Sequence, residues 1–151
     1  MTICIVDTSI LVELLNLPGL ASRHEALVSG FVQRQEAREQ FLLPIAVLVE
    51  TGNHVAQIPD GTLRRKAADD FTRFATTSLQ GTSPFAPTPL PSKEDITAWL
   101  HDFPDNAMRG IGLADRSLIE LWEVHRKLHP QRRVYLWSLD QALVGYDTGT
   151  R

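Results

Sequence analysis

Two carboxylates in this sequence stand directly after short apolar runs, where they could take part in chemistry. Asp7 ends the run from residue 3 to residue 6, and Asp140 lies just past the run from residue 134 to residue 137. An acid at the end of a buried strand either caps the helix that follows or faces a ligand at the edge of the sheet. Taken alone, each acid is explained equally well by either role.

Two further acids stand in apolar helical surroundings. Glu50 follows five apolar residues, 45 to 49, so no polar face is open to it on its N-terminal side. Asp115 lies in the first turn of a predicted helix, where the helix dipole also favours an anion. It shares a face with residues that should pack inward, namely Leu118, Ile119 and Trp122. We therefore expect Glu50 and Asp115 to face the interior.

All four acids are expected at one edge of a parallel sheet, because strands end and the following helices begin there. Clustered carboxylates repel one another and raise one another's pKa values. A hard divalent cation with oxygen ligands, Mg²⁺ or Mn²⁺, removes that conflict. The five histidines are scattered and there is one cysteine, so no zinc-type ligand set competes. The sequence thus predicts a Mg²⁺-type or Mn²⁺-type site.

The elements that would position these acids alternate between strand and helix. Strands are predicted at 3–6, 41–43 and 134–137, with a further short one around Phe85 in a proline-rich loop. Helices are predicted at 8–15, 20–40, 45–57, 63–74, 92–103 and 113–128, followed by a short helical tail. Ser92 and Asp95 form a capping pattern, and Pro104 is predicted to end that helix.

This alternation predicts an α/β fold, with a small, mostly parallel sheet flanked by helices in a three-layer α/β/α sandwich. Without an internal repeat or linker, the 151 residues are expected to form a single domain, 1–151. Cys4 lies within the first predicted strand and is expected to be a small buried hydrophobe.

Composition narrows the possible functions. The chain has 15 Lys and Arg against 18 Asp and Glu, which argues against binding nucleic acid mainly through bulk positive charge. No apolar run approaches the roughly 20 residues that a membrane span needs. No secretion signal precedes the first strand. We therefore expect a soluble, cytoplasmic protein.

Four segments resemble the four acidic motifs of PIN-domain ribonucleases. They are Ile5-Val-Asp7-Thr-Ser9, Pro44 to Glu50, Gly112-Leu-Ala-Asp115 and Trp137-Ser-Leu-Asp140. Within that family the chain is most similar to the VapC toxins of bacterial toxin–antitoxin pairs. The resemblance covers nearly the whole chain. Each motif alone is weak, and the ordered set of acids in its strand and helix context is more specific.

The resemblance implies a PIN-like fold and an endoribonuclease that depends on Mg²⁺ or Mn²⁺. It implies that the catalytic residues and metal ligands are Asp7, Glu50, Asp115 and Asp140, supported by the hydroxyl of Ser9. The last motif has Ser138 where relatives usually have threonine, and this serine offers the same hydroxyl. Ala142 stands where many relatives have a further acid. One or two bound ions are therefore both compatible with the sequence.

Basic side chains could contact the RNA backbone. The candidates are Arg64, Arg65, Lys66, Arg109 and Arg116, although for each of them an ordinary solvated surface position is the favoured interpretation. His54 and His125 could act as general bases, and they too are favoured as ordinary core or surface histidines.

The resemblance also implies protein partners. A toxin of this kind is held inactive by a cognate antitoxin, which often inserts a segment into the acidic pocket, where an arginine would mimic the charge of a metal. A homodimer is common in the family, and residues 8 to 40 are a plausible interface.

Two other function classes remain open. The first is a PIN-like interaction module whose pocket no longer catalyses, against which the retention of all four acids argues. The second is a phosphotransfer α/β domain. A phosphatase of that kind needs a second acid two residues after the first, where this chain has Ser9, and a response-regulator receiver needs an acid pair and a lysine that are missing.

Overall fold

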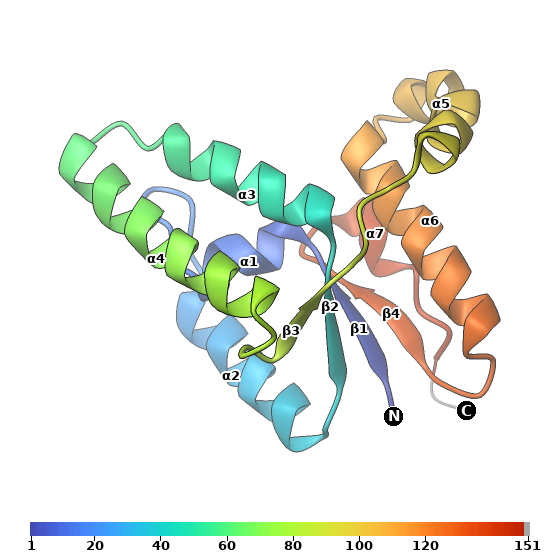
Figure 1. Ribbon diagram of the computed structural model, residues 1–151, viewed down its shortest axis with the longest axis horizontal. Helices are drawn as coiled ribbons and strands as arrows, with labels where there is room; N and C mark the ends of the chain where they lie inside the picture. Colours follow the sequence, from blue (N-terminus) through green and yellow to red (C-terminus); the bar gives the residue numbers. More distant parts are fainter. Residues whose placement is uncertain (150–151) are drawn as a thin grey trace.

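A four-stranded, all-parallel sheet forms the centre of the protein in the computed structural model, which describes residues 1–149 (Figure 1). The strands are β1 (Ile3–Val6), β2 (Gln40–Leu43), β3 (Phe85–Pro87) and β4 (Val134–Trp137), in the order β3-β2-β1-β4. The predicted parallel α/β sheet is confirmed, including the short strand around Phe85. The last two residues of the predicted domain, 150 and 151, lie outside the described part.

Seven helices surround the sheet in the described part of the chain. They are α1 (Thr8–Leu14), α2 (His24–Glu36), α3 (Ile45–Ala56), α4 (Gly61–Leu79), α5 (Lys93–Met108), α6 (Leu113–Leu128) and α7 (Gln141–Val144). The chain steps from β1 to β2 to β3 in one direction and then returns to the opposite edge at β4. Right-handed crossovers therefore place α1–α4 on one side of the sheet and α5 and α6 on the other, as Figure 1 shows.

The register of β1 and β4 determines which residues lie side by side where these two strands end. Both β1 and β4 are buried along their whole length, as expected for parallel strands covered on both faces. Val6 pairs with Trp137, and the backbone N–H of Asp7 donates to the Trp137 carbonyl at 3.0 Å. Asp7 and Ser138 consequently leave the sheet side by side.

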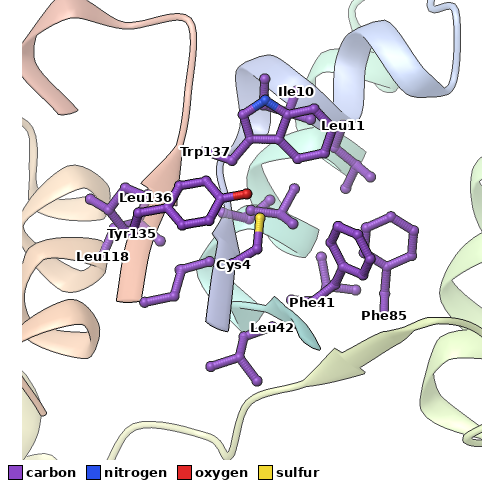
Figure 2. Packing of buried hydrophobic residues seen from close by; sticks show 14 of the residues in the cluster. Cys4, Ile10, Leu11, Phe41, Leu42, Phe85, Leu118, Tyr135, Leu136 and Trp137 are labelled. Carbon is purple, nitrogen blue, oxygen red and sulfur yellow. The ribbon is translucent and has the colours of Figure 1, made fainter. Parts of the chain in front are cut away.

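The core lies between the sheet and the helices on both faces. Figure 2 shows Cys4 and Tyr135 in the middle of it, with Phe41 and Phe85 packed together toward β3. The Phe41 and Phe85 ring centroids are 5.5 Å apart. Cys4 is fully buried, and burial raises the pKa of its thiol to about 12. The prediction of Cys4 as a small buried hydrophobe is confirmed.

The prediction that Pro104 ends its helix is wrong, because α5 continues to Met108 with Pro104 inside it. Proline removes one backbone N–H and strains the preceding turn. The turn after it is held by side chains instead: the Asn106 amide donates to Asp102 at 3.0 Å, and Arg109 donates to Asn106 at 2.8 Å. Helix α5 begins where predicted, with a complete capping box at Ser92.

Two other helices differ in length from their predictions. Helix α2 is shorter than the predicted 20–40, and α4 is longer than the predicted 63–74. Helix α4 begins earlier because the Asp60 carboxylate accepts the backbone N–H of Leu63 at 2.8 Å and so caps the first turn. Among residues 1–149 no helix combines the length and apolarity that crossing a bilayer requires.

Candidate metal centre

Asp7 is the most firmly held of the four acids. Its side chain is not a helix cap, although the residue occupies the N-cap position of α1. The Ser9 and Ser138 hydroxyls each donate to its Oδ2 at 2.7 Å. Only 6% of the residue is exposed. Two hydroxyls therefore orient a buried carboxylate and leave its other oxygen, Oδ1, outside this pair of bonds.

Asp140 lies at the same edge of the sheet, one strand over, and is exposed. Its backbone N–H donates to the Ser138 hydroxyl at 2.9 Å, and its Oδ1 accepts the Ala142 N–H at 2.9 Å. The capping role considered for Asp140 is therefore real, and it uses one carboxylate oxygen. Ser138 connects the two acids, because it donates to Asp7 and accepts from the backbone of Asp140.

Glu50 differs from the expectation that it faces the interior, because 44% of its side chain is exposed. The apolar residues before it line an open groove as well as the core, and Val49 is 59% exposed. The Thr8 hydroxyl donates to Glu50 Oε2 at 3.1 Å, and His54 Nε2 lies 4.0 Å from Oε1. Sequence reasoning missed this role of Thr8; its position beside Asp7 was the available signal.

Asp115 lies in the first turn of α6, above the buried Leu118. As expected, the helix face that it shares with Leu118 packs against the core. Burial, followed by the negative charges of the other three acids, raises the pKa of the Asp115 carboxyl to about 6. None of the groups that shift this pKa is a cation. Asp115 therefore lies near enough to each of the other three acids for their charges to interact.

The donor set fits a hard divalent cation. All four side chains offer carboxylate oxygens, the ligands that Mg²⁺ and Mn²⁺ prefer, and no arginine or lysine is among the groups that shift the pKa of Asp115. Within residues 1–149 no three acidic, histidine or cysteine side chains are drawn together as a ready-made ion site. The structure thus brings the predicted acids to one edge and leaves them apart from one another.

The five predicted RNA-contacting residues are all engaged within the chain. Arg65 and Lys66 pair with acids one turn along α4, Arg64 donates to the Ile58 carbonyl, and Arg109 donates to Asn106. Arg116 pairs with both Asp102 and Glu120 and is the most buried of the five. The start of α4, which carries three of these residues, lies far from α6 and α7 in Figure 1. Their role in RNA binding stays a prediction.

A groove opens beside the acids, between α3, the extended segment 88–91, α5 and α6. Its volume is about 780 Å³, and its lining is mostly apolar. Glu50 lies at its wall as well as among the four acids. We refer to this feature as the α3–α6 groove. The helical periodicity of the sequence placed these residues on helix faces. It did not indicate that these faces leave an open groove between them.

Comparison of the sequence with protein-family models and with curated proteins, and of the structure with solved structures, found no match.

Proposed function

We propose that this protein is a metal-dependent endoribonuclease of the PIN type, the toxin of a toxin–antitoxin pair, which hydrolyses RNA phosphodiester bonds with Mg²⁺ or Mn²⁺. One observation carries the proposal. Carboxylates from four separate elements come to one edge of the sheet, where burial and the charges of the other three acids raise the pKa of Asp115, and no cation is among the groups that shift it. A divalent ion would offset the negative charge that these acids bring to one edge.

The four acids would hold the ion, each from a different support. Asp7 is oriented by two serine hydroxyls, Glu50 by Thr8, and Asp140 by the start of α7. Such hydrogen bonds to ligands fix their orientation and raise metal affinity. Because burial and the neighbouring acids raise the pKa of the Asp115 carboxyl to about 6, a protonated Asp115 has to release its proton before it can serve as a ligand.

A bound ion would polarise the scissile phosphate, activate a water and stabilise the leaving 3′ oxygen. The contribution of the chain is to orient the acids through hydrogen bonds. The hydroxyls of Ser9 and Ser138 occupy one oxygen of Asp7, and the Asp140 cap occupies another carboxylate oxygen. An RNA strand would then lie across the edge where β1 and β4 end.

RNA cleavage in defined metal conditions tests the proposal. We expect a single-stranded RNA pool to be cut in Mg²⁺ or Mn²⁺ and to stay intact in chelator. Asp7→Asn and Asp115→Asn should each reduce cleavage by about 100-fold or more, since loss of mere supporting groups already costs roughly 10–100-fold. Asp69→Asn, an exposed acid on α4, is the matched control and should cut normally.

Cleavage at the wild-type rate in both Asp7→Asn and Asp115→Asn would contradict the proposal. Absence of Mn²⁺ binding by calorimetry would instead favour the second class, an interaction module without catalysis.

A cognate antitoxin and a homodimer belong to the same proposal. An antitoxin segment with a basic side chain would match the acidic edge, because an arginine pairs strongly with carboxylates. A small antitoxin gene immediately upstream would support the toxin assignment over that of a housekeeping nuclease. Light scattering would show whether the chain forms a dimer, and substitutions in residues 8 to 40 would test the interface that we favour.

A further inference from the structure

Glu50 presents its two carboxylate oxygens to different neighbours. Oε2 accepts the hydroxyl of Thr8, the residue that follows Asp7, at 3.1 Å. Oε1 lies 4.0 Å from Nε2 of His54, one turn further along α3. Helix α3 begins where β2 ends, at the edge to which the acids come, so His54 lies further along the helix from that edge than Glu50 does. One oxygen of Glu50 is therefore next to a histidine outside the set of four acids.

The separation between Glu50 and His54 is too long for a hydrogen bond and close to that of two groups that share an ion. Hydrogen bonds from nitrogen to oxygen span about 2.7–3.2 Å. Two ligands that each lie about 2.0–2.2 Å from one ion are about 3–3.5 Å apart. A small rotation of either side chain would close the difference. Both have room to rotate, because 37% of the His54 side chain and 44% of the Glu50 side chain are exposed.

The imidazole of His54 is not engaged elsewhere in the described part of the chain. Within residues 1–149 neither of its ring nitrogens forms a hydrogen bond, and Glu50 is the acid within ion-pair distance of it. His24 shows the contrast, because its Nδ1 lies 2.6 Å from the Glu13 carbonyl oxygen and so holds the start of α2. His54 therefore has ring nitrogens to offer to a ligand.

One imidazole nitrogen beside one carboxylate oxygen restricts which ion would bind. Imidazole suits ions such as Zn²⁺, whereas Mg²⁺ strongly favours oxygen ligands. Residues four apart on a helix are neighbours, so the pair needs no further element to bring it together. Sequence reasoning treated His54 as an ordinary histidine because the histidines are scattered. Its partner is an acid one turn earlier instead of a second histidine.

We propose that His54 and Oε1 of Glu50 hold a second divalent ion, of the kind that accepts imidazole ligands, Zn²⁺ or Mn²⁺. Glu50 would then bridge this ion and the ion of the four acids. In two-metal sites the ions lie about 3.5–4 Å apart and together stabilise the attacking and leaving oxygens of a phosphate. The catalytic role of the second ion rests on the proposed nuclease function, whereas its binding does not.

Zinc binding followed at the histidine rings tests the site without any cleavage. The imidazole ¹⁵N signals of histidine-labelled, metal-free protein would be recorded at pH 8, where an ordinary imidazole is neutral, and His→Gln variants would assign them. We expect added Zn²⁺ to shift the signal of His54 Nε2 saturably, and the same concentration of Mg²⁺ to leave it in place. His101, an exposed histidine on α5, should not respond.

Two variants separate this site from that of the four acids. Glu50→Gln keeps the size of the side chain and removes its charge, and it should weaken Zn²⁺ binding at His54 by about tenfold or more. Asp7→Asn is the matched variant, because it removes an acid of the other ion and keeps Glu50 and His54. It should leave the affinity at His54 nearly unchanged. Failure of the nuclease proposal would appear in RNA cleavage, and failure of this inference in the His54 signal.

Three results would overturn the assignment. The first is no saturable shift of the His54 signal in Zn²⁺. The second is equal Zn²⁺ affinity at His54 in Glu50→Gln and the wild-type protein, which would show that the ring binds zinc without the acid. The third is an equal shift in Mg²⁺, which would show that the signal reports charge at the acids and not coordination by the imidazole.

Discussion

Ser138 is the residue on which the orientation of two acids depends. It donates to Asp7 and accepts the backbone N–H of Asp140. Ser138→Ala would remove both bonds, and we expect Mn²⁺ affinity to fall by roughly 10–100-fold, the usual effect of losing a group that orients a ligand. Calorimetry with Mn²⁺ measures this directly.

Ser138→Thr is the matched variant, because it keeps the hydroxyl; it should retain most of the affinity. Ser78→Ala, which removes a buried hydroxyl far from the acids on α4, should leave affinity unchanged. Equal Mn²⁺ affinity in Ser138→Ala and the wild-type protein would show that the hydroxyl does not orient the site.

Asp115 makes the metal-free protein sensitive to pH. Its pKa is about 6 in the folded chain and 3.8 in the unfolded chain. Well below pH 3.8 both states hold the proton. As the pH rises toward 6 the unfolded chain ionises first, so the folded state loses stability, and above pH 6 the whole cost is present. Asp115→Asn removes this cost.

We therefore expect Asp115→Asn to be more stable than wild type above pH 6 in chelator, and to gain much less stability at pH 4. The gain should be roughly 1–2 kcal/mol, after allowance for solvent screening of this partly exposed group. Urea unfolding at pH 4 and pH 8 measures it. A difference in stability that is the same at both pH values would be inconsistent with the raised pKa.

At the scale of elements, helix α5 contains an internal proline, Pro104, although proline is unfavourable inside a helix. Pro104 lies in the exposed part of the helix and leaves the Leu100 carbonyl without its usual backbone donor. Pro104→Ala should stabilise the protein by about 1–3 kcal/mol in urea unfolding. Asp105→Ala, the neighbouring exposed position, should change stability by roughly 0.5 kcal/mol at most. A Pro104→Ala protein no more stable than wild type would show that α5 tolerates the proline without strain.

The strands could be predicted well from the sequence. The lengths of the helices and the open groove between helix faces could not. β1 and β4 are continuous apolar runs, which is what burial on both faces requires. The end of α5 was missed because side-chain bonds around Asn106 continue the helix beyond Pro104. Glu50 was expected to face inward because apolar residues precede it, whereas those residues border a groove.

At the scale of the molecule, the strand order explains why the acids meet. The chain moves from β1 to one edge of the sheet and later returns to β4 on the other side of β1. Ligands of open α/β sheets bind where the strand order reverses in this way. The order of the strands could not be read from the sequence. The sequence did predict that Asp7 and Asp140 lie at the same edge of the sheet, because both residues follow parallel strands.

Metal binding at this edge should stabilise the whole fold. An ion present at 100 times its dissociation constant adds about 2.7 kcal/mol, which corresponds to roughly 5–10 °C in Tm for a chain of this size. We expect Mn²⁺ to raise the Tm more at pH 8 than at pH 5, where Asp115 is protonated. Asp7→Asn should abolish the rise, and Asp69→Asn should not. A Tm unaffected by Mn²⁺ at pH 8 would count against a metal site.

The most direct test of the central claim, that the four acids share a metal ion, is a crystal structure of the protein soaked in Mn²⁺, with the ion located by its anomalous scattering. We predict an anomalous peak at the carboxyl edge of β1 and β4, with oxygens of Asp7 and the other three acids at about 2.0–2.2 Å. Glu50 and Asp115 should turn toward it from their metal-free positions. Carboxylates that still point apart in saturating Mn²⁺, with no peak among them, would contradict the account.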